Sequence, residues 1–81
     1  MLEINLAGPL RDAAGGVTAI AMEAGTIREL LRRLVERYPA MEGELDAGIA
    51  VSINGDIYRD SWNKEIPQDA EVFLLPRIAG G

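Results

Sequence analysis

The sequence contains no cysteine and no histidine, and only 5% of its residues are aromatic. Without cysteine there is no disulfide, no thiolate nucleophile, no Fe–S cluster and no Cys-based zinc site, and without histidine there is no imidazole base. No apolar run approaches the length of a membrane span, and residues 1–6 lack the basic region of a signal peptide. We therefore expect a cytoplasmic chain that binds neither a metal nor a membrane.

Positive charge is also scarce. The 81 residues include 8 Lys and Arg against 13 Asp and Glu, which gives a net charge of −5. Nucleic-acid binding needs clustered cations that neutralise phosphates, so no nucleic-acid partner is expected. A chain of this length buries only about 60–65% of its unfolded surface, which leaves little room for an enclosed active site. The sequence predicts one small domain that is not an enzyme, with no catalytic residues and no bound cofactor.

Three segments alternate apolar residues with polar or small ones, the pattern of strands with one buried face. The first covers residues 2–6 and ends at Gly8-Pro9, and the second covers residues 17–22, so together they predict a hairpin. The third covers residues 49–53. Asn54-Gly55 follows it and favours a type I′ turn, after which residues 56–58 should pair back.

A helix is predicted to begin at Thr26. Thr26 and Glu29 form a capping box, in which the hydroxyl accepts a bond from the Glu29 amide and the Glu29 carboxylate reaches back to the Thr26 N–H. Pro39 should end the helix near Tyr38. The apolar residues fall on one helical stripe: Ile27, Leu30, Leu31, Leu34, Val35 and Tyr38.

The opposite face of this helix carries Arg28, Arg32, Arg33, Glu36 and Arg37. One interpretation is a docking stripe for an acidic partner. The other is a solvated face supported by ion pairs from Glu29 to Arg33 and from Arg32 to Glu36.

Two further segments have ordinary structural interpretations. Glu42, Glu44 and Asp46 lie in a stretch that predicts one short turn of helix, and they lack the spaced oxygen ligands of a calcium loop. Trp62 is interpreted as a cap over the edge of the core and not as a binding anchor.

The C-terminal segment is the most informative. Residues 71–75 predict a last strand, stopped by Pro76, so the order of elements predicts an α+β fold with one sheet packed on one helix. Beyond it the chain ends in Gly80-Gly81. Because glycine has no Cβ, such a tail can lie extended in a narrow channel and present a terminal carboxylate to a reactive centre.

At this point the chain resembles the ubiquitin-like β-grasp sulfur carriers, and within them the small subunit of molybdopterin synthase (MoaD-type), with the thiamine carrier (ThiS-type) as a cousin. The resemblance covers the whole length. It rests on residues 10–15, Gly25-Thr26, residues 52–55 and the segments 69–76 and 80–81. It implies a β-grasp domain over residues 1–76, with a mixed sheet of four to five strands on one main helix, and a flexible tail over residues 77–81.

The resemblance also implies a chemistry for the tail. A ubiquitin-activating-like adenylyltransferase uses ATP to adenylate Gly81, and a sulfur donor protein then converts it to a thiocarboxylate. Arg77, Ile78, Ala79 and Gly80 would enter a channel of the partner, which for this pathway is the large subunit of molybdopterin synthase. The catalytic groups then belong to the partners.

The last strand also suggests a docking patch. Residues 72–75 are apolar at every position, yet a sheet with one helix buries only one of its faces. By analogy with ubiquitin we assign Val72 and Leu74 to the helix side, which leaves Phe73 and Leu75 for a partner. The alternative is that the loop over residues 60–66 covers Phe73.

Other functions stay open at the level of sequence. The chain could be a carrier for the thiamine or another sulfur pathway, or a ubiquitin-like modifier joined through Gly81 to lysines of target proteins. It could also be a bare β-grasp interaction module whose terminal glycines are accidental.

Overall fold

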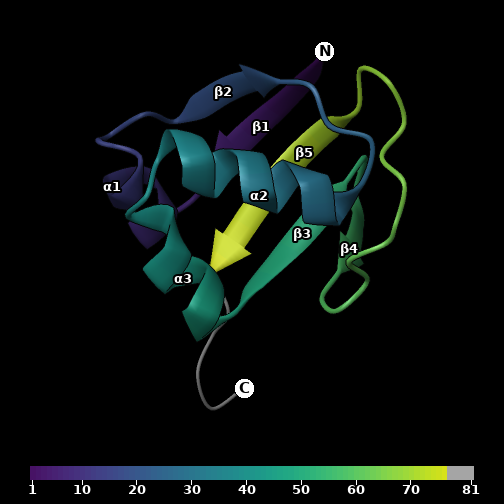
Figure 1. Cartoon of the computed structure of the whole chain (residues 1–81). Coiled ribbons are helices and arrows are strands. Elements are labelled where there is room, and N and C mark those ends of the chain that lie inside the picture. The colour runs from purple at the N-terminus through teal and green to yellow at the C-terminus, as the bar shows by residue number, and fades with distance from the viewer. Residues whose placement is uncertain (77–81) are drawn as a thin grey trace.

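A computed structural model describes residues 1–76 of the chain. Five strands form one sheet in the order β2-β1-β5-β3-β4. Along the chain the elements are β1 (Leu2–Leu6), α1 (Pro9–Ala13), β2 (Ala19–Met22), α2 (Ile27–Arg37), α3 (Met41–Ala47), β3 (Ile49–Ile53), β4 (Asp56–Tyr58) and β5 (Glu71–Pro76). Figure 1 shows α2 lying across one face of this sheet.

The central strand of the sheet is β5. It pairs parallel with β1 on one side and antiparallel with β3 on the other, while β2 and β4 pair antiparallel with their neighbours at the two edges. The parallel pair requires a crossover between β1 and β5, and the segment containing α2 lies in it. The predicted α+β fold, a mixed sheet with one main helix, is confirmed.

The core lies between α2 and the sheet. Ile27, Leu30 and Leu34 of α2 are almost completely buried, as the predicted helical stripe requires, and they face the sheet residues of one parity. Met41 closes the core from α3. The sheet contributes these buried residues: Leu2, Ile4, Leu6, Ile20, Met22, Ile49, Val51, Ile53, Val72 and Leu74.

The predicted cap of α2 is confirmed in one half and wrong in the other. The Glu29 N–H donates to Thr26 Oγ1 at 3.2 Å, as expected. The Glu29 carboxylate, however, accepts from the Gly25 N–H at 2.7 Å and not from the Thr26 N–H. Gly25 precedes the helix by one more residue, so the carboxylate closes a wider turn.

The remaining N–H groups at the start of α2 find partners far along the chain. The Ile27 N–H donates to the Lys64 carbonyl at 3.0 Å, and the Arg28 N–H donates to the Trp62 carbonyl at 2.8 Å. These donors have no partner within the helix itself. The loop around residues 61–66 therefore completes the helix, and Trp62 contributes through its backbone.

The connection between β1 and β2 differs from the predicted plain hairpin, because it contains α1. Pro9 stands at the start of this short helix, where its missing N–H is not needed, and Leu10 anchors the helix in the core. β2 begins at Ala19, two residues later than expected. At the other predicted hairpin, φ is 49° at Asn54 and 95° at Gly55, which confirms the turn.

Candidate functional site

On the face of the sheet opposite α2, side chains from β1, β5, β3 and β4 form one continuous row. Phe73 of β5 lies opposite Asn5 of β1 on one side and opposite Ser52 of β3 on the other. Ser52 in turn lies opposite Ile57 of β4. Because Val72 and Leu74 point into the core, Phe73 between them points away from α2.

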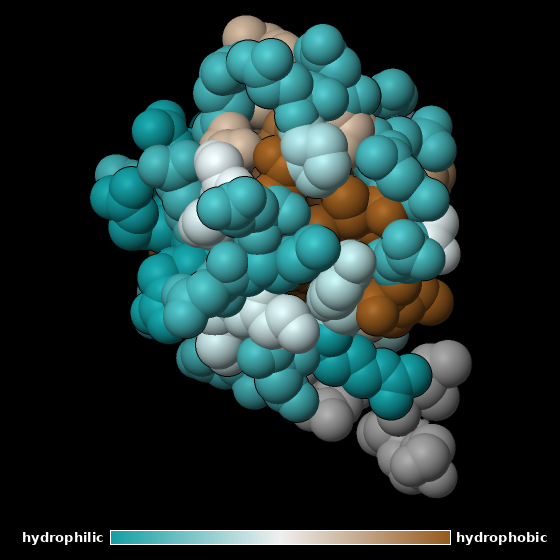
Figure 2. All heavy atoms as spheres, turned by 90° about the vertical axis from the view of Figure 1, so that its right-hand side faces the viewer, coloured by the Kyte–Doolittle hydropathy of each residue, from teal (hydrophilic) through white to brown (hydrophobic). Residues whose placement is uncertain are grey.

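Two apolar side chains of this row reach the surface. Phe73 is 38% exposed and Ile57 is 57% exposed, while Ser52 between them is only 8% exposed. Leu75 lies on the same face in the next row, opposite Ala50, and is half-buried. Figure 2 views the molecule from the side of β4 and shows hydrophobic side chains exposed within a mostly hydrophilic surface.

The structure therefore places Phe73 and Leu75 together on the face that the sequence predicted. The loop over residues 60–66 does not take the role suggested by the alternative, since its backbone binds the start of α2, on the other side of the sheet. Whether a partner covers Phe73 and Leu75 stays a prediction.

Ile57 belongs to the same face and was missed in the sequence. The signal was present, because a two-residue Asn-Gly turn fixes the register of the hairpin and puts Ile57 opposite Ser52. Ser52 has the parity of Ala50, which alternates with the buried Val51. We define the open face as Ala50, Ser52, Ile57, Phe73 and Leu75.

The predicted tail residues Arg77, Ile78, Ala79, Gly80 and Gly81 lie outside the described residues. The described chain ends with β5, at Pro76. Figure 1 shows this end of the central strand at one margin of the sheet, remote from the start of β1. The described chain therefore ends on the central strand of the sheet and not on an edge strand.

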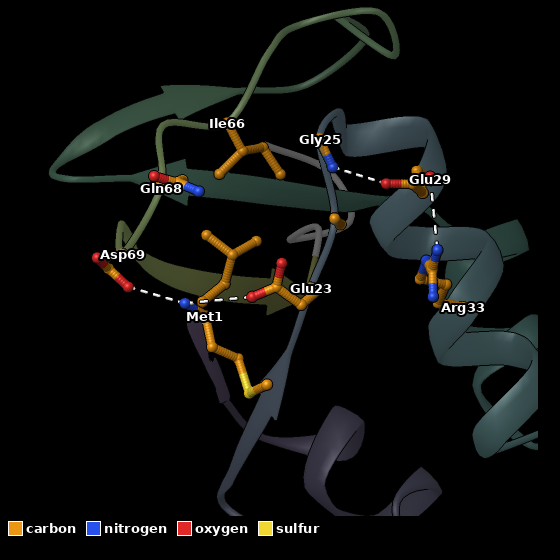
Figure 3. Close-up of a pocket in the computed structure, with 10 residues that line it drawn as sticks. Met1, Glu23, Gly25, Glu29, Arg33, Ile66, Gln68 and Asp69 are labelled. Carbon is orange, nitrogen blue, oxygen red and sulfur yellow. Dashed lines mark hydrogen bonds and ion pairs between the residues drawn. The ribbon is translucent and has the colours of Figure 1, made fainter.

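A hollow of about 320 Å³ lies at the opposite end of the molecule, between the start of β1, α2 and the segment before β5. Figure 3 shows its charged groups paired with one another. The Met1 amino group donates to Asp69 Oδ1 at 2.8 Å and lies 3.3 Å from Glu23 Oε1. Glu29 Oε2 lies 3.7 Å from Arg33 Nη2.

These pairs shift the pKa of three groups in the directions that stabilise their charges. The hydrogen bonds to Asp69 and Glu23 raise the pKa of the Met1 amino group. The same ammonium lowers the pKa of the Asp69 carboxyl, and the Gly25 N–H lowers the pKa of the Glu29 carboxyl, with Arg33 and Arg32 adding to it. The groups are solvent-exposed and already paired, so the hollow has the character of a structural ion-pair cluster and not of a reaction centre.

Comparison with known protein families supplies the assignment. The model of the ThiS family matches residues 4–81, which is nearly the whole chain. The chain belongs to the ThiS family. This is a family of small sulfur carriers and ubiquitin-like modifiers that work with partner proteins, as the resemblance predicted.

Solved structures show the same β-grasp fold as this ThiS-family chain. A chain of the Amycolatopsis orientalis BexX/CysO complex is 19% identical, with a TM-score of 0.81 and full coverage of both chains, 100% each. The small archaeal modifier protein 1 of H. volcanii is 26% identical, with a TM-score of 0.70 and coverage of 95% of this chain and 97% of that one. A comparison with curated proteins finds no match.

A third structure is a complex of subunits 1 and 2 of the molybdopterin-converting factor from Helicobacter pylori. The matching chain is 21% identical, with a TM-score of 0.70 and coverage of 99% of this chain and 97% of that one. Two of these three similar structures are therefore complexes with a partner protein.

The arginines of α2 divide into two groups in this ThiS-family protein. Arg32 and Arg33 lie 4.0 and 3.7 Å from the Glu29 carboxylate, so the expected Glu29 to Arg33 pair is confirmed. An Arg32 to Glu36 pair is not found among residues 1–76. The arginines follow each other in i, i+4 pairs, Arg28 with Arg32 and Arg33 with Arg37, and the two pairs lie on opposite flanks of the exposed face.

The described part of the chain offers no metal site. Within residues 1–76 there is no group of three or more Asp, Glu, His or Cys side chains placed to hold an ion, and Glu42, Glu44 and Asp46 are not gathered into one. Nor does this part contain a helix of the length and apolar character that crossing a membrane requires.

Proposed function

We propose that this protein is a sulfur carrier whose Gly81 carboxylate is adenylated and converted to a thiocarboxylate, and that it serves as the small subunit of molybdopterin synthase. The observation that carries the proposal is the extent of the family match. It runs to residue 81 and so includes Gly80-Gly81 as well as the β-grasp domain.

The chemistry follows from the poor reactivity of a free carboxylate. An activating enzyme of the ubiquitin-activating type joins the Gly81 carboxylate to AMP and releases pyrophosphate from ATP. A hydrosulfide equivalent from a sulfur donor protein then attacks the carbonyl carbon, so a C–S bond forms and the C–O bond to AMP breaks. In this proposal the partners supply the acid and base groups for these steps, and the domain carries the reacting carboxylate.

The open face is the surface we propose for docking these partners. Phe73 and Ile57 expose apolar side chains around the buried Ser52, and Leu75 continues the patch toward the end of β5 where the tail begins. A partner that covers this face is therefore next to the point from which residues 77–81 enter its active site. Aromatic anchors at the centre of such a patch commonly carry much of the binding energy.

The test is intact-mass measurement of the protein after incubation with ATP, the activating enzyme and a sulfide source. We expect a mass increase equal to the difference between sulfur and oxygen. Deletion of Gly81 should abolish the increase without changing thermal unfolding, because the residue lies beyond the last strand. If the shortened chain still acquires sulfur, the proposal is wrong.

Gly80→Val tests the requirement for a narrow channel separately from the requirement for a terminal carboxylate. The variant keeps the terminal carboxylate but adds a β-branched side chain beside it. Loss of sulfur transfer in this variant, with the fold unchanged, supports an extended tail in a narrow channel.

A second function is favoured by the similarity to the small archaeal modifier protein 1, the most identical of the three structures described above. In this alternative Gly81 is joined to lysines of target proteins. A thiamine-type carrier is a third, suggested by the name of the family. Mass analysis of protein isolated from its own cell distinguishes them, because a carrier ends in a thiocarboxylate and a modifier forms branched conjugates.

A further inference from the structure

We propose that the free edge of β2, together with the flank of α2 beside it, binds an extended acidic segment of a partner protein by adding it to the sheet as a further strand. This surface is separate from the open face and from the tail. The proposal does not depend on the chemistry of Gly81.

The backbone of β2 presents bonding groups to solvent. The Leu6 N–H donates to the Thr18 carbonyl at 2.9 Å, and in this register bonded and unbonded residues alternate along the strand. Ile20 and Met22 therefore direct their N–H and C=O groups toward β1, whereas Ala19 and Ala21 direct theirs away. Because β2 is the edge of the sheet, no other strand of the described chain takes up these groups.

This edge has only one of the devices that usually limit pairing with another chain. Natural edge strands are very short, or carry a charged residue, a proline or a bulge. The strand Ala19–Met22 is short, with four residues, but it has no charge, proline or bulge, and its register with β1 is uninterrupted. Ala19 and Ala21 add only small side chains, so an approaching backbone meets little steric hindrance.

A shallow groove of about 500 Å³ runs between this strand and α2. Ala21, Met22 and Glu23 form one wall, and Arg33, Glu36 and Arg37 form the other. Figure 1 shows α2 running alongside β2. A strand added to the edge of β2 would point every second side chain into this groove.

The spacing of the two arginines fits such a strand. Residues four apart on a helix are separated by about 6 Å along its axis, and alternate residues of a strand by about 7 Å. Carboxylates at alternate positions could therefore meet Arg33 and Arg37 together, with Arg33 also lying 3.7 Å from the Glu29 carboxylate. Glu36 and Glu23 restrict the remaining positions, where uncharged side chains fit better.

A second copy of this chain fits the edge less well. Two four-residue strands that pair edge to edge cover far less than the roughly 1,200 Å² of a stable interface. A flexible segment of another protein can instead fill the groove as well as the edge, so it gains contacts that a folded copy cannot reach.

The probe is a blocked hexapeptide that alternates valine and glutamate, with a valine and lysine peptide of the same pattern as control. We expect saturable changes in the amide signals of β2, and slower hydrogen exchange at the Ala19 and Ala21 amides. The Ile20 amide is an internal control, since it already bonds to β1. No saturable change up to about 5 mM of the glutamate peptide would overturn the proposal.

Variants test the arginine contacts and the backbone pairing separately. Replacing both Arg33 and Arg37 by Glu should weaken peptide binding about tenfold or more, whereas replacing Arg28 and Arg32 by Glu, on the far flank of the same helix, should change it less than about twofold. Each pair includes one arginine that contacts Glu29, so the loss of that ion pair is matched.

Ala21→Pro removes an outward N–H without removing a bond to β1, and should abolish the exchange protection, while Ala21→Val should retain it. Three results contradict the proposal. The two double variants weaken peptide binding equally, or the peptide changes the amide signals mainly around Ser52 and Phe73, or the β2 signals change with protein concentration when no peptide is added. The last would indicate that a second copy occupies the edge.

Discussion

At the scale of single residues, the contrast between Leu34 and Arg32 tests the orientation of α2. Leu34 is completely buried, and Leu34→Ala should lower the free energy of unfolding by about 2–5 kcal/mol, because it leaves a cavity in the core between α2 and the sheet. Arg32 lies in solvent and makes one long contact with Glu29, so Arg32→Ala should have a much smaller effect. Chemical denaturation of both variants measures this, and equal losses would contradict the helix orientation.

Glu29 should make stability depend on pH in a defined direction. The Gly25 N–H, followed by Arg33 and Arg32, lowers the pKa of this carboxyl in the folded protein. Its contribution is therefore fully present above the ordinary glutamate pKa and is lost as the pH falls through the lower, folded value. The difference in unfolding free energy between the wild type and Glu29→Gln should shrink over that acidic range.

Thr26→Ala is the control for this experiment. It removes the other half of the cap, at a cost of about 0.5–2 kcal/mol. A hydroxyl does not titrate in this range, so the loss should be the same at pH 7 and in acid. A Glu29→Gln difference that is equally constant would show that the carboxylate charge has no role in the cap.

The same cap shows what sequence can determine about a single residue. Thr26 and Glu29 at this spacing identified the helix start, because the hydroxyl bond is local and follows from the spacing. The choice of Gly25 as the donor to Glu29 depends on a distant segment. The Gly25 carbonyl binds the Ile66 N–H and the Ile27 N–H binds the Lys64 carbonyl, so the extended backbone at Thr26 is set by a segment outside the helix.

At the scale of elements, two glycines should respond oppositely to the same change. Gly55 has a φ of 95° in the β3–β4 turn, where a Cβ is strained, so Gly55→Ala should destabilise by about 1–2 kcal/mol. Gly43 lies within α3 with open space around it, so Gly43→Ala should stabilise by about 0.5–1 kcal/mol. Thermal unfolding of the two variants provides the measurement, and a shift of the same sign in both would contradict the assignment.

The strands and the main helix were predictable because each has a strong periodic pattern. The helix α1 was not, since its five residues are too few to show a period and Gly8-Pro9 was interpreted only as a stop signal. Pro9 in fact begins the helix. The role of residues 61–66 was also out of reach, because their backbone satisfies a helix that lies more than thirty positions earlier in the chain.

At the scale of the whole molecule, a Phe73 variant tests whether the face of the sheet opposite α2 binds a partner. Phe73→Ser should weaken binding to the activating enzyme, since an aromatic side chain at the centre of an interface commonly contributes about 2 kcal/mol or more. Stability should fall much less than for a fully buried position of the same strand, because Phe73 is 38% exposed. Affinity measurements combined with chemical denaturation test both statements.

Leu74→Ala is the matched control, one residue further along the same strand. Leu74 is completely buried, so the variant should lose about 2–5 kcal/mol of stability while the open face keeps its side chains. A Phe73→Ser variant that behaves like Leu74→Ala and binds normally once folded would place the docking surface elsewhere.

The parity of β5 was predictable at this scale, and the extent of the open face was not. Alternation along residues 72–75 separates two sets of side chains, and one helix can cover only one of them. Ile57 joins the exposed set through pairing across β3, which requires the register of a second hairpin. The groove between β2 and α2 depends on how the helix crosses the sheet, which no local pattern specifies.

The central position of β5 has a mechanical consequence. The strand is held by β1 on one side and β3 on the other, and backbone bonds in a sheet lie across the strand direction. A pull on the chain at Pro76 along the axis of β5 therefore loads both ladders in shear, so their bonds must break together and not one after another. A partner can therefore pull on this end with considerable force before the domain unfolds. The same force on the edge strand β2 would load only one ladder.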